Sequence, residues 1–432
     1  MYKEAIQDAI SMHELPSKWR SEVLNEANHV AKKKKSAKYR KDLRKLPFAT
    51  IDGEDAKDFD DAVYCVKNSN GYKLYVAIAD VSFYVEPGSK LDKEAKKRGT
   101  SIYFPETVIP MLPENLSNGI CSLRPNEDRC SMICEMSIGL DGTRKKYKFY
   151  SGLINSKARL TYSQVEKHLQ TSANIKQAIV RESIKHLFDL TNIRLKLRNE
   201  RKALEINPKE AILKLSKNKE VTNIVIKKTL FAHKLVEESM LLANESAAEF
   251  MQERLDLGVY RIHEDPDPSK LETLKKHFKI PTQIAKKLSP LEVINRCLQE
   301  AHNKKDDTGQ ILVLQTLARA EYSTNNLGHF GLQLKQYSHF TSPIRRYPDL
   351  LVHRLINSSL AHKKPGIRQN ELQDECENSS MLERRAEKAS RQVEQVLICS
   401  YLKTKIGSTM DGVITGVTDF GLFINLEPYF IS

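Results

Sequence analysis

The chain has 432 residues, 40% of them hydrophobic, which is too long for one ordinary domain and apolar enough for a large core. Because no run approaches about 18 apolar residues and the N-terminus lacks the apolar segment of a secretion signal, the sequence excludes a membrane-spanning or secreted protein and predicts a cytoplasmic one. The formal net charge of +14 indicates a polyanionic partner, either nucleic acid or an anionic membrane surface, although solubility alone would also explain it.

Residues 1–47 are predicted to form a helical, basic N-terminal extension. The extension ends in the sequence AKKKKSAKYRKDLRK at residues 31–45. This basic tract is either a solvated linker or a non-specific contact to phosphate groups. Its position directly before the first predicted strand leaves both interpretations open.

Short β-strands are predicted between Phe48 and Tyr150, because apolar and polar residues alternate there with a period of two. The Asn-Ser-Asn-Gly sequence at 68–71 marks a tight turn between two of these strands. Cys130 and Cys134 lie in a later strand, and their spacing does not suit a metal site. Since seven cysteines is an odd number, no disulfide framework is expected, and these two are predicted to be small hydrophobic residues.

Helices are predicted over residues 163–200 and 225–256, where apolar residues recur at i, i+3 and i+4. Two further helices are expected to begin near Tyr347 and Asn370, and alternating β sequence returns after Gly407. Because strands, helices and strands follow one another without βαβ alternation, we predict an α+β fold with a mixed β-sheet, surrounding helices and a small C-terminal β module.

The segment FATIDGEDAKDFDDAV carries six carboxylates in one loop between two predicted strands: Asp52, Glu54, Asp55, Asp58, Asp60 and Asp61. Two such charges about 5 Å apart repel by roughly 3 kcal/mol, so a fold seldom gathers them without a cation. Hard oxygen ligands suit Mg²⁺ or Mn²⁺, and two such ions can polarise a phosphate and activate water. A solvated acidic turn is the alternative. The apolar anchors Ile51 and Phe59, and the basic character of the rest of the chain, favour the site of a metal-dependent nuclease.

The sequence YSHFTSPIRRYPDLLVHRL places Arg345 and Arg346 directly before a predicted helix. Pro348 suits the first turn of that helix, and Asp349 complements its dipole. Arginine side chains and helix N-termini both bind phosphate oxygens. Surface arginines on a capped helix would give the same pattern, so this segment alone leaves both interpretations open.

Aromatic residues surround these arginines at Tyr337, Phe340 and Tyr347. Aromatic rings between cationic side chains favour the binding of single-stranded nucleic acid through stacking and charge. His339 and His353 are predicted to be packed or hydrogen-bonded, because no spacing between carboxylates and histidines supports a metal site there.

These segments and several others resemble the RNB family of exoribonucleases, and the forms GEDAKDFDDA and SPIRRYPDL are more similar to ribonuclease R than to ribonuclease II. The resemblance covers residues 48–400, which would form the RNB catalytic domain. The matching motifs are TIDGEDAKDFDDAV at 50–63, VAIADVSFYV at 76–85, SIYFPETVIPMLPENLSNGICSL at 101–123, AHKLVEESMLLAN at 232–244, YRIHEDP at 260–266 and HFTSPIRRYPDLLVHR at 339–354.

The resemblance implies a processive 3′-to-5′ hydrolytic exoribonuclease that acts on the single-stranded 3′ end of RNA, releases nucleoside 5′-monophosphates and uses Mg²⁺, or else Mn²⁺. A monomer without a membrane partner is expected. The implied metal ligands are Asp52, Asp58, Asp60 and Asp61. The implied catalytic residues are Asp60, Asp58 and Arg345. The implied RNA-binding residues are Tyr103, which would stack on the terminal base, Arg345, which would hold the scissile phosphate, and Arg346.

The chain departs from the family pattern at several points. No cold-shock OB fold precedes residue 48, and residues 405–432 resemble only the start of an S1-type OB fold, so a fragment or a shortened protein is expected. Ile206 stands where the family often has a phenylalanine that forms the second face of the base clamp, and Ser390 stands where some members have an acidic residue. A catalytically weak or inactive RNB-like RNA-binding protein is therefore an alternative, as is a metal-dependent nuclease that acts on DNA or at internal sites.

Overall fold

The computed structural model describes residues 1–33, 39–171, 175–206, 210–419, 421–427, 429 and 431. Residues 34–38 of the basic tract, and positions 420, 428, 430 and 432 of the predicted C-terminal module, lie outside the described residues. Among the helices that the structure describes, none has both the length and the apolar character needed to cross a membrane.

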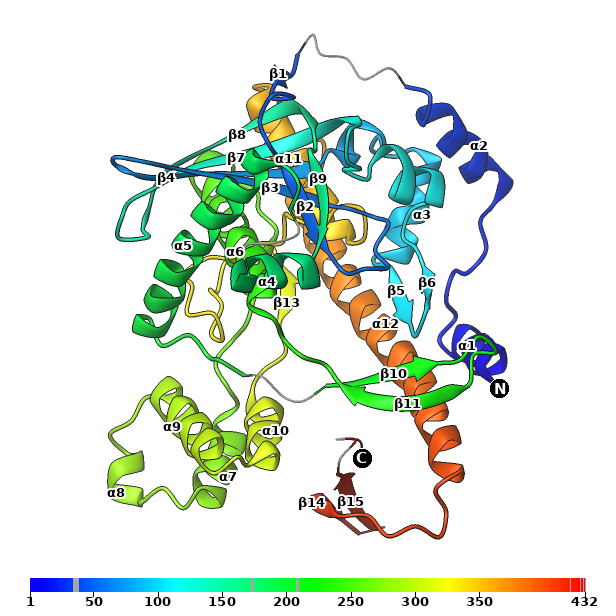
Figure 1. The fold of residues 1–432 in the computed structure, drawn as a ribbon, viewed down its shortest axis with the longest axis vertical. Coiled ribbons are helices and arrows are strands. Elements are labelled where there is room, and N and C mark those ends of the chain that lie inside the picture. Colours follow the sequence, from blue (N-terminus) through cyan, green and yellow to red (C-terminus); the bar gives the residue numbers. More distant parts are fainter. Residues whose placement is uncertain are drawn as a thin grey trace.

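A seven-stranded mixed β-sheet forms the centre of the fold (Figure 1), with the strand order β1-β8-β7-β4-β3-β2-β9. Its strands are β1 (Lys41–Asp42), β2 (Ala49–Asp52), β3 (Asp61–Asn68), β4 (Gly71–Ala79), β7 (Asp128–Ile138), β8 (Arg144–Asn155) and β9 (Ala158–Thr161). β1 pairs with β8, and β2 with β9, in parallel, whereas the other neighbours are antiparallel. The mixed sheet with its helices confirms the predicted α+β fold.

The β3–β4 hairpin forms at the predicted turn, where Asn68 pairs with Gly71. Gly71 has a φ of 138°, and a Cβ atom there would lie 2.0 Å from the carbonyl oxygen of Ile138. Glycine is therefore required where β4 begins beside the end of β7. Cys130 and Cys134 are buried in β7 and belong to no disulfide, which confirms their prediction as small hydrophobic residues.

Helices pack against the sheet to complete the main core. Phe149 of β8 contacts Phe250 and Phe340, with ring centroids 5.4 and 5.2 Å apart. The helices that enter this core are α2 (Ser21–Val30), α3 (Lys90–Arg98), η1 (Val81–Phe83), η2 (Asn115–Ile120), α4 (Tyr162–Thr171), α5 (Ala178–Glu200), α6 (Phe231–Arg254) and α11 (Tyr347–Leu360). α4 and α5 confirm most of the helix predicted over 163–200, but residues 175–177 are not helical and 172–174 lie outside the described residues. α6 confirms most of the helix predicted over 225–256, although residues 225–226 belong to β11, and α11 confirms the helix predicted near Tyr347.

A second core lies along the 35-residue helix α12 (Gln369–Lys403), which confirms the helix predicted near Asn370. The N-terminal helix α1 and two hairpins pack on it: α1 (Tyr2–Met12), β5 (Ile102–Phe104) with β6 (Thr107–Ile109), and β10 (Ala211–Leu215) with β11 (Val221–Ile226). The β10–β11 hairpin was not predicted. The described residues within 1–47 thus include α1, α2 and β1, and both helices are packed onto the rest of the molecule.

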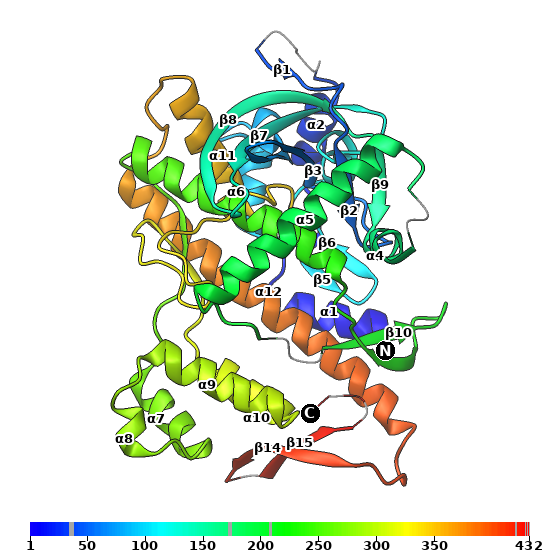
Figure 2. The ribbon, with the colours of Figure 1, turned by 60° about the vertical axis from the view of Figure 1, so that its left-hand side comes forward.

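Four helices form a lobe with its own apolar core, set apart from the sheet (Figure 2). They are α7 (Pro268–His277), α8 (Thr282–Ala285), α9 (Pro290–Asn303) and α10 (Asp307–Thr316). β12 (Tyr260–Ile262) and β13 (Glu321–Ser323) pair side by side where the chain enters and leaves the lobe. No element of this lobe was predicted.

The C-terminal segment contains an antiparallel hairpin, as the alternating sequence predicted. Its strands are β14 (Gly412–Thr418) and β15 (Gly421–Leu426). The described residues do not confirm a barrel, so the S1-type OB fold and the domain boundaries stay predictions.

Candidate active site

The acidic loop joins two strands of the central sheet. Asp52 is the last residue of β2, and Asp61 is the first residue of β3. The side chains of Ile51 and Phe59 are 1% and 6% exposed, which confirms that they anchor the loop in the core. The Oγ atom of Ser122 accepts a hydrogen bond of 3.0 Å from the backbone N–H of Phe59. The core therefore holds the loop in one conformation, and its aspartates have defined positions.

Arg159 on the neighbouring strand β9 fastens the other side of this loop. Its guanidinium donates hydrogen bonds to the carbonyl oxygens of Gly53 and Glu54, at 2.8 and 2.5 Å. β9 runs parallel to β2 and pairs Thr161 with Asp52, so the register of two strands places this arginine beside the aspartate. Its positive charge lowers the pKa of Asp52 against the larger effects that raise it.

Asp60 links the acidic loop to the segment that contains Arg345, 284 residues further along the chain at Ile344. Its Oδ1 atom accepts a hydrogen bond of 2.8 Å from the N–H of Ile344, and its Oδ2 atom lies 3.6 Å from Nε of Arg345. Asp60 is 5% exposed, whereas the Arg345 side chain is 43% exposed. The structure therefore brings the two predicted motifs together around one buried carboxylate.

We call the cluster of aspartates beside Arg345 the acidic pocket, and its members are Asp52, Asp58, Asp60 and Asp61. These carboxylates lack enough positive charge to balance them. Burial, and then the charge of Asp58, raise the pKa of Asp52 to about 6. Burial, and then the charge of Asp52, raise the pKa of Asp61 to about 8. Burial raises the pKa of Asp60 well above its usual value, against the opposing charge of Arg345. A cation placed among these groups would relieve both their desolvation and their repulsion.

The donor set fits a hard divalent cation, because all of its groups are carboxylates and because Oδ2 of Asp52 is buried without a hydrogen-bond partner among the described residues. No group of three histidine, cysteine, aspartate or glutamate side chains within the described residues is arranged to hold a metal ion. The assignment of Asp52, Asp58, Asp60 and Asp61 as metal ligands therefore stays a prediction. Glu54 and Asp55, the other acids of the loop, are exposed.

Arg346 differs from its neighbour because it makes a bidentate ion pair within its own segment. Its Nε and Nη2 atoms donate to the two carboxylate oxygens of Asp349, at 2.9 and 2.7 Å. Asp349 is fully buried and also accepts a hydrogen bond of 2.8 Å from the N–H of Ser342. Pro348 lies in the first turn of α11, as predicted. This pair fixes the segment that presents Arg345, and RNA binding by Arg346 itself stays a prediction.

The aromatic residues around the arginines are buried, so the prediction that they stack on nucleic acid is wrong. Tyr337, Phe340 and Tyr347 are 7%, 0% and 3% exposed. Their rings lie on the inner side of the segment, where Asn244 donates a hydrogen bond of 3.0 Å to the hydroxyl of Tyr337. The alternation of aromatic residues and arginines along the sequence did not reveal which side of the segment faces solvent.

The two histidines of this region are hydrogen-bonded, as predicted. Nδ1 of His339 lies 2.8 Å from the hydroxyl of Tyr322, and Nε2 of His353 lies 2.8 Å from the carbonyl oxygen of Phe340. Burial lowers the pKa of both imidazoles. They support the fold beneath the site as neutral groups.

Tyr103 lies in the β5–β6 hairpin and is 47% exposed. Ser101, two residues before Tyr103, connects this hairpin to the segment of Arg345, because its backbone N–H donates a hydrogen bond of 2.9 Å to the carbonyl oxygen of Arg345. Ser390 of α12 donates a hydrogen bond of 2.8 Å to the carbonyl oxygen of Tyr103. Burial, opposed by Arg345, raises the pKa of this phenol, and the charge of Asp58 adds to the effect. A partly exposed ring next to the acidic pocket fits the predicted stacking role.

Tyr162 is a further residue of the pocket that the sequence did not reveal. It begins α4 directly after β9, and its ring stacks on that of His233 with centroids 4.0 Å apart. Burial, and then the charges of Asp52 and Asp61, raise its pKa. The position of Tyr162 follows from the pairing of β9 with β2, and no local pattern in the sequence predicts that pairing.

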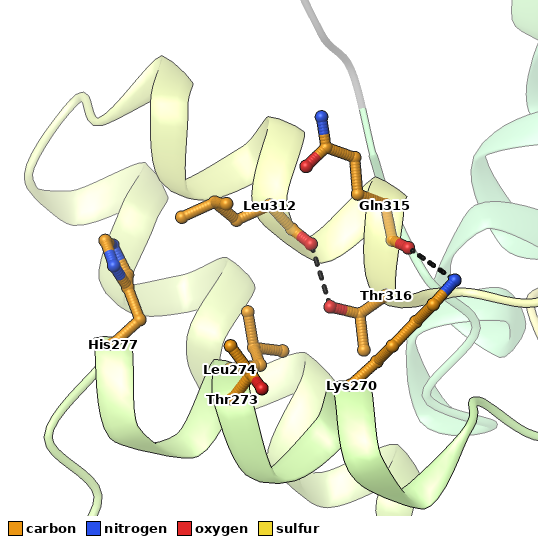
Figure 3. A pocket seen from close by; sticks show the side chains of 7 residues that line it. All are labelled: Lys270, Thr273, Leu274, His277, Leu312, Gln315 and Thr316. Atoms are coloured by element: carbon orange, nitrogen blue, oxygen red, sulfur yellow. Dashed lines mark hydrogen bonds between the residues drawn. The ribbon is translucent and has the colours of Figure 1, made fainter. Parts of the chain in front are cut away.

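Two cavities lie elsewhere in the described part of the chain, and neither is lined by any of these aspartates. One, of about 520 Å³, is lined by Ile206, Arg198 and Glu237 among others, and Ile206 also packs on the core of the helical lobe. The other, of about 440 Å³, lies between α7 and α10 (Figure 3). Some of its polar groups are paired within the lobe, as in the hydrogen bond of 3.5 Å from Lys270 to the carbonyl oxygen of Gln315. The clamp role of the position at Ile206 stays a prediction.

Comparisons with known proteins agree with this geometry. The family model described as RNB domain matches residues 40–362. Ribonuclease R of Escherichia coli (strain K12) is 40% identical over 99% of this chain and 55% of its own length, and that of Vibrio cholerae is 39% identical over 99% and 54%. The structure titled Mycoplasma genitalium RNase R in complex with ribose methylated single-stranded RNA has a TM-score of 0.92 and 30% identity, and covers 100% of this chain and 69% of that one.

This chain spans about half the length of the two curated relatives, 55% and 54%. The matched residues 40–362 include every carboxylate of the pocket, Tyr103 and Arg345. A family match over most of the chain, together with the high identity to proteins named ribonuclease R, shows that the chain belongs to the RNB domain family.

Proposed function

We propose that this chain is a hydrolytic exoribonuclease that degrades single-stranded RNA processively from its 3′ end and releases nucleoside 5′-monophosphates. The observation that carries the proposal is the cluster of the buried Asp60 and the half-buried Asp52 and Asp61 beside Arg345, in which the pKa values of all three aspartates are raised. Membership of the RNB domain family and the similarity to proteins named ribonuclease R support the choice of RNA as the substrate.

The residues that would hold a divalent cation, Mg²⁺ or else Mn²⁺, are Asp52, Asp58, Asp60 and Asp61. When bound, such a cation activates water and offsets charge on the phosphate. The unpaired Oδ2 atom of Asp52 and the mutual repulsion of the carboxylates support this assignment.

The other residues bind and orient the RNA. The exposed guanidinium of Arg345 stabilises the negative charge that builds on the phosphate oxygens, while Asp60 and the ion pair of Arg346 with Asp349 hold that arginine in place. Tyr103 stacks on a base at the 3′ end. Water attacks the last phosphorus and gives up a proton, and the P–O3′ bond breaks. The O3′ atom takes up a proton and stays on the shortened RNA as its new 3′ hydroxyl, while the phosphate leaves on the 5′ oxygen of the released nucleotide.

The test is incubation of labelled single-stranded RNA and DNA of the same sequence with the chain, in Mg²⁺ or in EDTA, followed by chromatography of the products. We expect 5′-monophosphates from RNA only, and only with Mg²⁺. Cleavage of the DNA, or of internal bonds, would overturn the proposal in favour of another nuclease. RNA that is bound but stays intact in Mg²⁺ would overturn it in favour of a non-catalytic RNA-binding protein.

Tyr103→Ala should lengthen the shortest product by about one or two nucleotides, because the terminal bases lose a stacking surface. High-resolution gel electrophoresis of the end products measures this length. Val108→Ala is the matched control, since Val108 is the residue opposite Tyr103 in the same hairpin. If both variants leave the same end product as the unaltered chain, the stacking role is wrong.

A further inference from the structure

The central sheet has a second charged face that the proposed reaction does not use. Side chains alternate between the two faces of a strand, so Tyr64, three residues beyond Asp61 on β3, lies on the face opposite to that aspartate. The strands β3, β4, β7 and β8 are neighbours and antiparallel throughout, so their registers define which residues share this face.

Two rows of side chains cross this face from strand to strand. The first row is Tyr64, Tyr75, Glu135 and Lys148. The second row is Val66, Lys73, Ser137 and Lys146. We call the six polar and aromatic side chains Tyr64, Lys73, Tyr75, Glu135, Lys146 and Lys148, together with Lys41 and Tyr150 beside them, the basic sheet face.

Glu135 organises the positive charges of the basic sheet face. It is 4% exposed, and the ammonium groups of Lys73, Lys148 and Lys41 lie 2.9, 3.3 and 3.8 Å from its carboxylate oxygens. The hydroxyl of Tyr150 donates a further hydrogen bond of 2.6 Å. One negative charge thus faces three positive ones, which leaves an excess of two.

The ammonium groups are accessible to a ligand. The side chains of Lys41, Lys73 and Lys148 are 54%, 38% and 59% exposed, and Lys146 is exposed as well. An ammonium group has three donors, so those that contact Glu135 keep donors for phosphate oxygens. Lys41 also belongs to the described part of the basic tract at 31–45, whose function the sequence left open.

Aromatic rings lie between these cations. Tyr64 and Tyr75 are stacked with ring centroids 5.5 Å apart, and Phe48 packs edge-on against both. The ammonium groups of Lys41 and Lys148 lie 4.9 and 5.9 Å from the ring centre of Tyr150. Tyr64, Tyr75 and Tyr150 are each partly exposed, so bases can reach them.

We propose that the basic sheet face binds single-stranded RNA outside the active site, through phosphates on its lysines and bases against its tyrosines. The substrate class rests on the proposed function, but the surface lies on the opposite face of the sheet from Asp61. An acidic protein segment would use the lysines and leave the tyrosine rings idle, which is why RNA is the better match. Glu182 of α5 places a negative charge near Tyr64, at the β3 edge of the face. Because this charge would repel phosphate groups, RNA binding should centre on β4, β7 and β8.

The experiment compares the double variant Lys146→Gln/Lys148→Gln with the unaltered chain. Lys73 and Tyr150 still contact Glu135 in this variant, so the carboxylate stays paired. Lys286→Gln/Lys287→Gln is the control, since it removes the same charge from two exposed lysines of the helical lobe. The probe is a fluorescent single-stranded RNA of about 30 nucleotides, titrated in EDTA over a range of salt concentrations.

We expect the double variant to bind this RNA about tenfold more weakly at about 0.1 M salt, and the slope of log K against log salt to fall by about 1.4, as the loss of two phosphate contacts predicts. The control should change neither value. Affinity and slope equal to those of the unaltered chain, or an equal change in the control, would overturn the proposal. If the double variant shows a lower Tm, Lys146→Gln alone, with an expected change of slope of about 0.7, decides the question.

Two further measurements separate this proposal from its alternatives. Polyglutamate is used as a second probe, and an equal loss of binding to polyglutamate and to RNA would overturn RNA in favour of an acidic protein partner. Hydrolysis of an RNA of about six nucleotides should be unchanged in the double variant, because that length serves the active site only. Since binding is measured in EDTA, an inactive chain would overturn the proposed function without affecting this result.

Discussion

Two buried carboxylate sites on the central sheet differ in what surrounds them. Asp60 in the acidic pocket and Glu135 on the basic sheet face are 5% and 4% exposed. Burial raises the pKa of Asp60, and the opposing charge of Arg345 does not offset it. Burial would also raise the pKa of Glu135, but hydrogen bonds from Tyr150 and Lys73 and the nearby lysine charges hold it below its usual value.

The difference teaches that charge balance, and not depth of burial, distinguishes a carboxylate that a bound cation would stabilise from one whose charge is already paired. The acidic pocket gathers more negative than positive charge, and a bound cation would offset that excess. The basic sheet face has more positive than negative charge, which suits a polyanion. An RNA chain that contacts the basic sheet face and ends at the acidic pocket would meet both requirements.

Asp60→Asn should have the largest effect, a loss of turnover of about 1,000-fold or more, because the central carboxylate of the pocket loses its charge. RNA affinity in EDTA should stay within about twofold, since the lysines that we propose to bind RNA lie elsewhere. Single-turnover hydrolysis and anisotropy titrations measure the two quantities. Asp55→Asn, an exposed acid of the same loop, is the control and should keep full activity. Lost RNA binding in a folded Asp60→Asn chain would count against the metal role.

The sequence predicted what depends on local pattern. Period-two alternation located the strands, the Asn-Gly turn located the β3–β4 hairpin, and the packed acids of one loop located half of the pocket. The link from Asp60 to Arg345 was reached only through the resemblance to a family, because nothing local connects residues almost 300 positions apart. Long-range contacts of this kind depend on tertiary packing.

The remaining features depend on strand register and on which side of a segment is buried. Tyr162 joins the pocket only because β9 pairs with β2, and Glu135 meets Lys148 only because β7 pairs with β8. Tyr347 was misjudged because its burial is set by the rest of the fold. The helical lobe, with its own core, escaped prediction although Ser289 and Glu292 form a capping box at the start of α9.

Asp61→Asn should give the second largest effect, on stability. The folded-state pKa of Asp61 is raised to about 8 from 3.8, so its contribution is favourable at low pH and is lost as pH rises through about 8. In EDTA at about pH 8, the variant should be more stable than the unaltered chain by about 2 kcal/mol, and the gain should shrink towards about pH 5.

Urea unfolding at both pH values measures this difference. Mg²⁺ should stabilise the unaltered chain more at the higher pH, because the cation competes with protons for the same carboxylates, and the variant should lose most of that response. Asp55→Asn again serves as the control. A variant that is less stable than the unaltered chain in EDTA at high pH would show that the pocket is balanced without a cation.

Glu135→Gln is the counterpart on the basic sheet face, and its expected effect is smaller and opposite in sign. Removal of the carboxylate should lower the free energy of unfolding by about 1–2 kcal/mol near neutral pH, because three lysines lose their shared partner but can turn to water. Since the folded-state pKa of Glu135 is lowered, the difference should be present above about pH 4.5 and fade as pH falls below it. Glu300→Gln, which breaks the pair with Lys304 on α9, is the control with an expected change below about 0.5 kcal/mol.

The Glu135→Gln variant also tests whether RNA binding and RNA hydrolysis depend on separate sites. The lysines around position 135 would repel one another and have no internal counterion, so RNA binding in EDTA should become tighter as stability falls. Hydrolysis of short RNA should be unchanged, because Glu135 lies on the opposite face from Asp61. Weaker RNA binding by a folded Glu135→Gln chain would mean that Glu135 arranges the lysines for the ligand instead of competing with it, and the simple contrast of charge between the two faces would then be wrong.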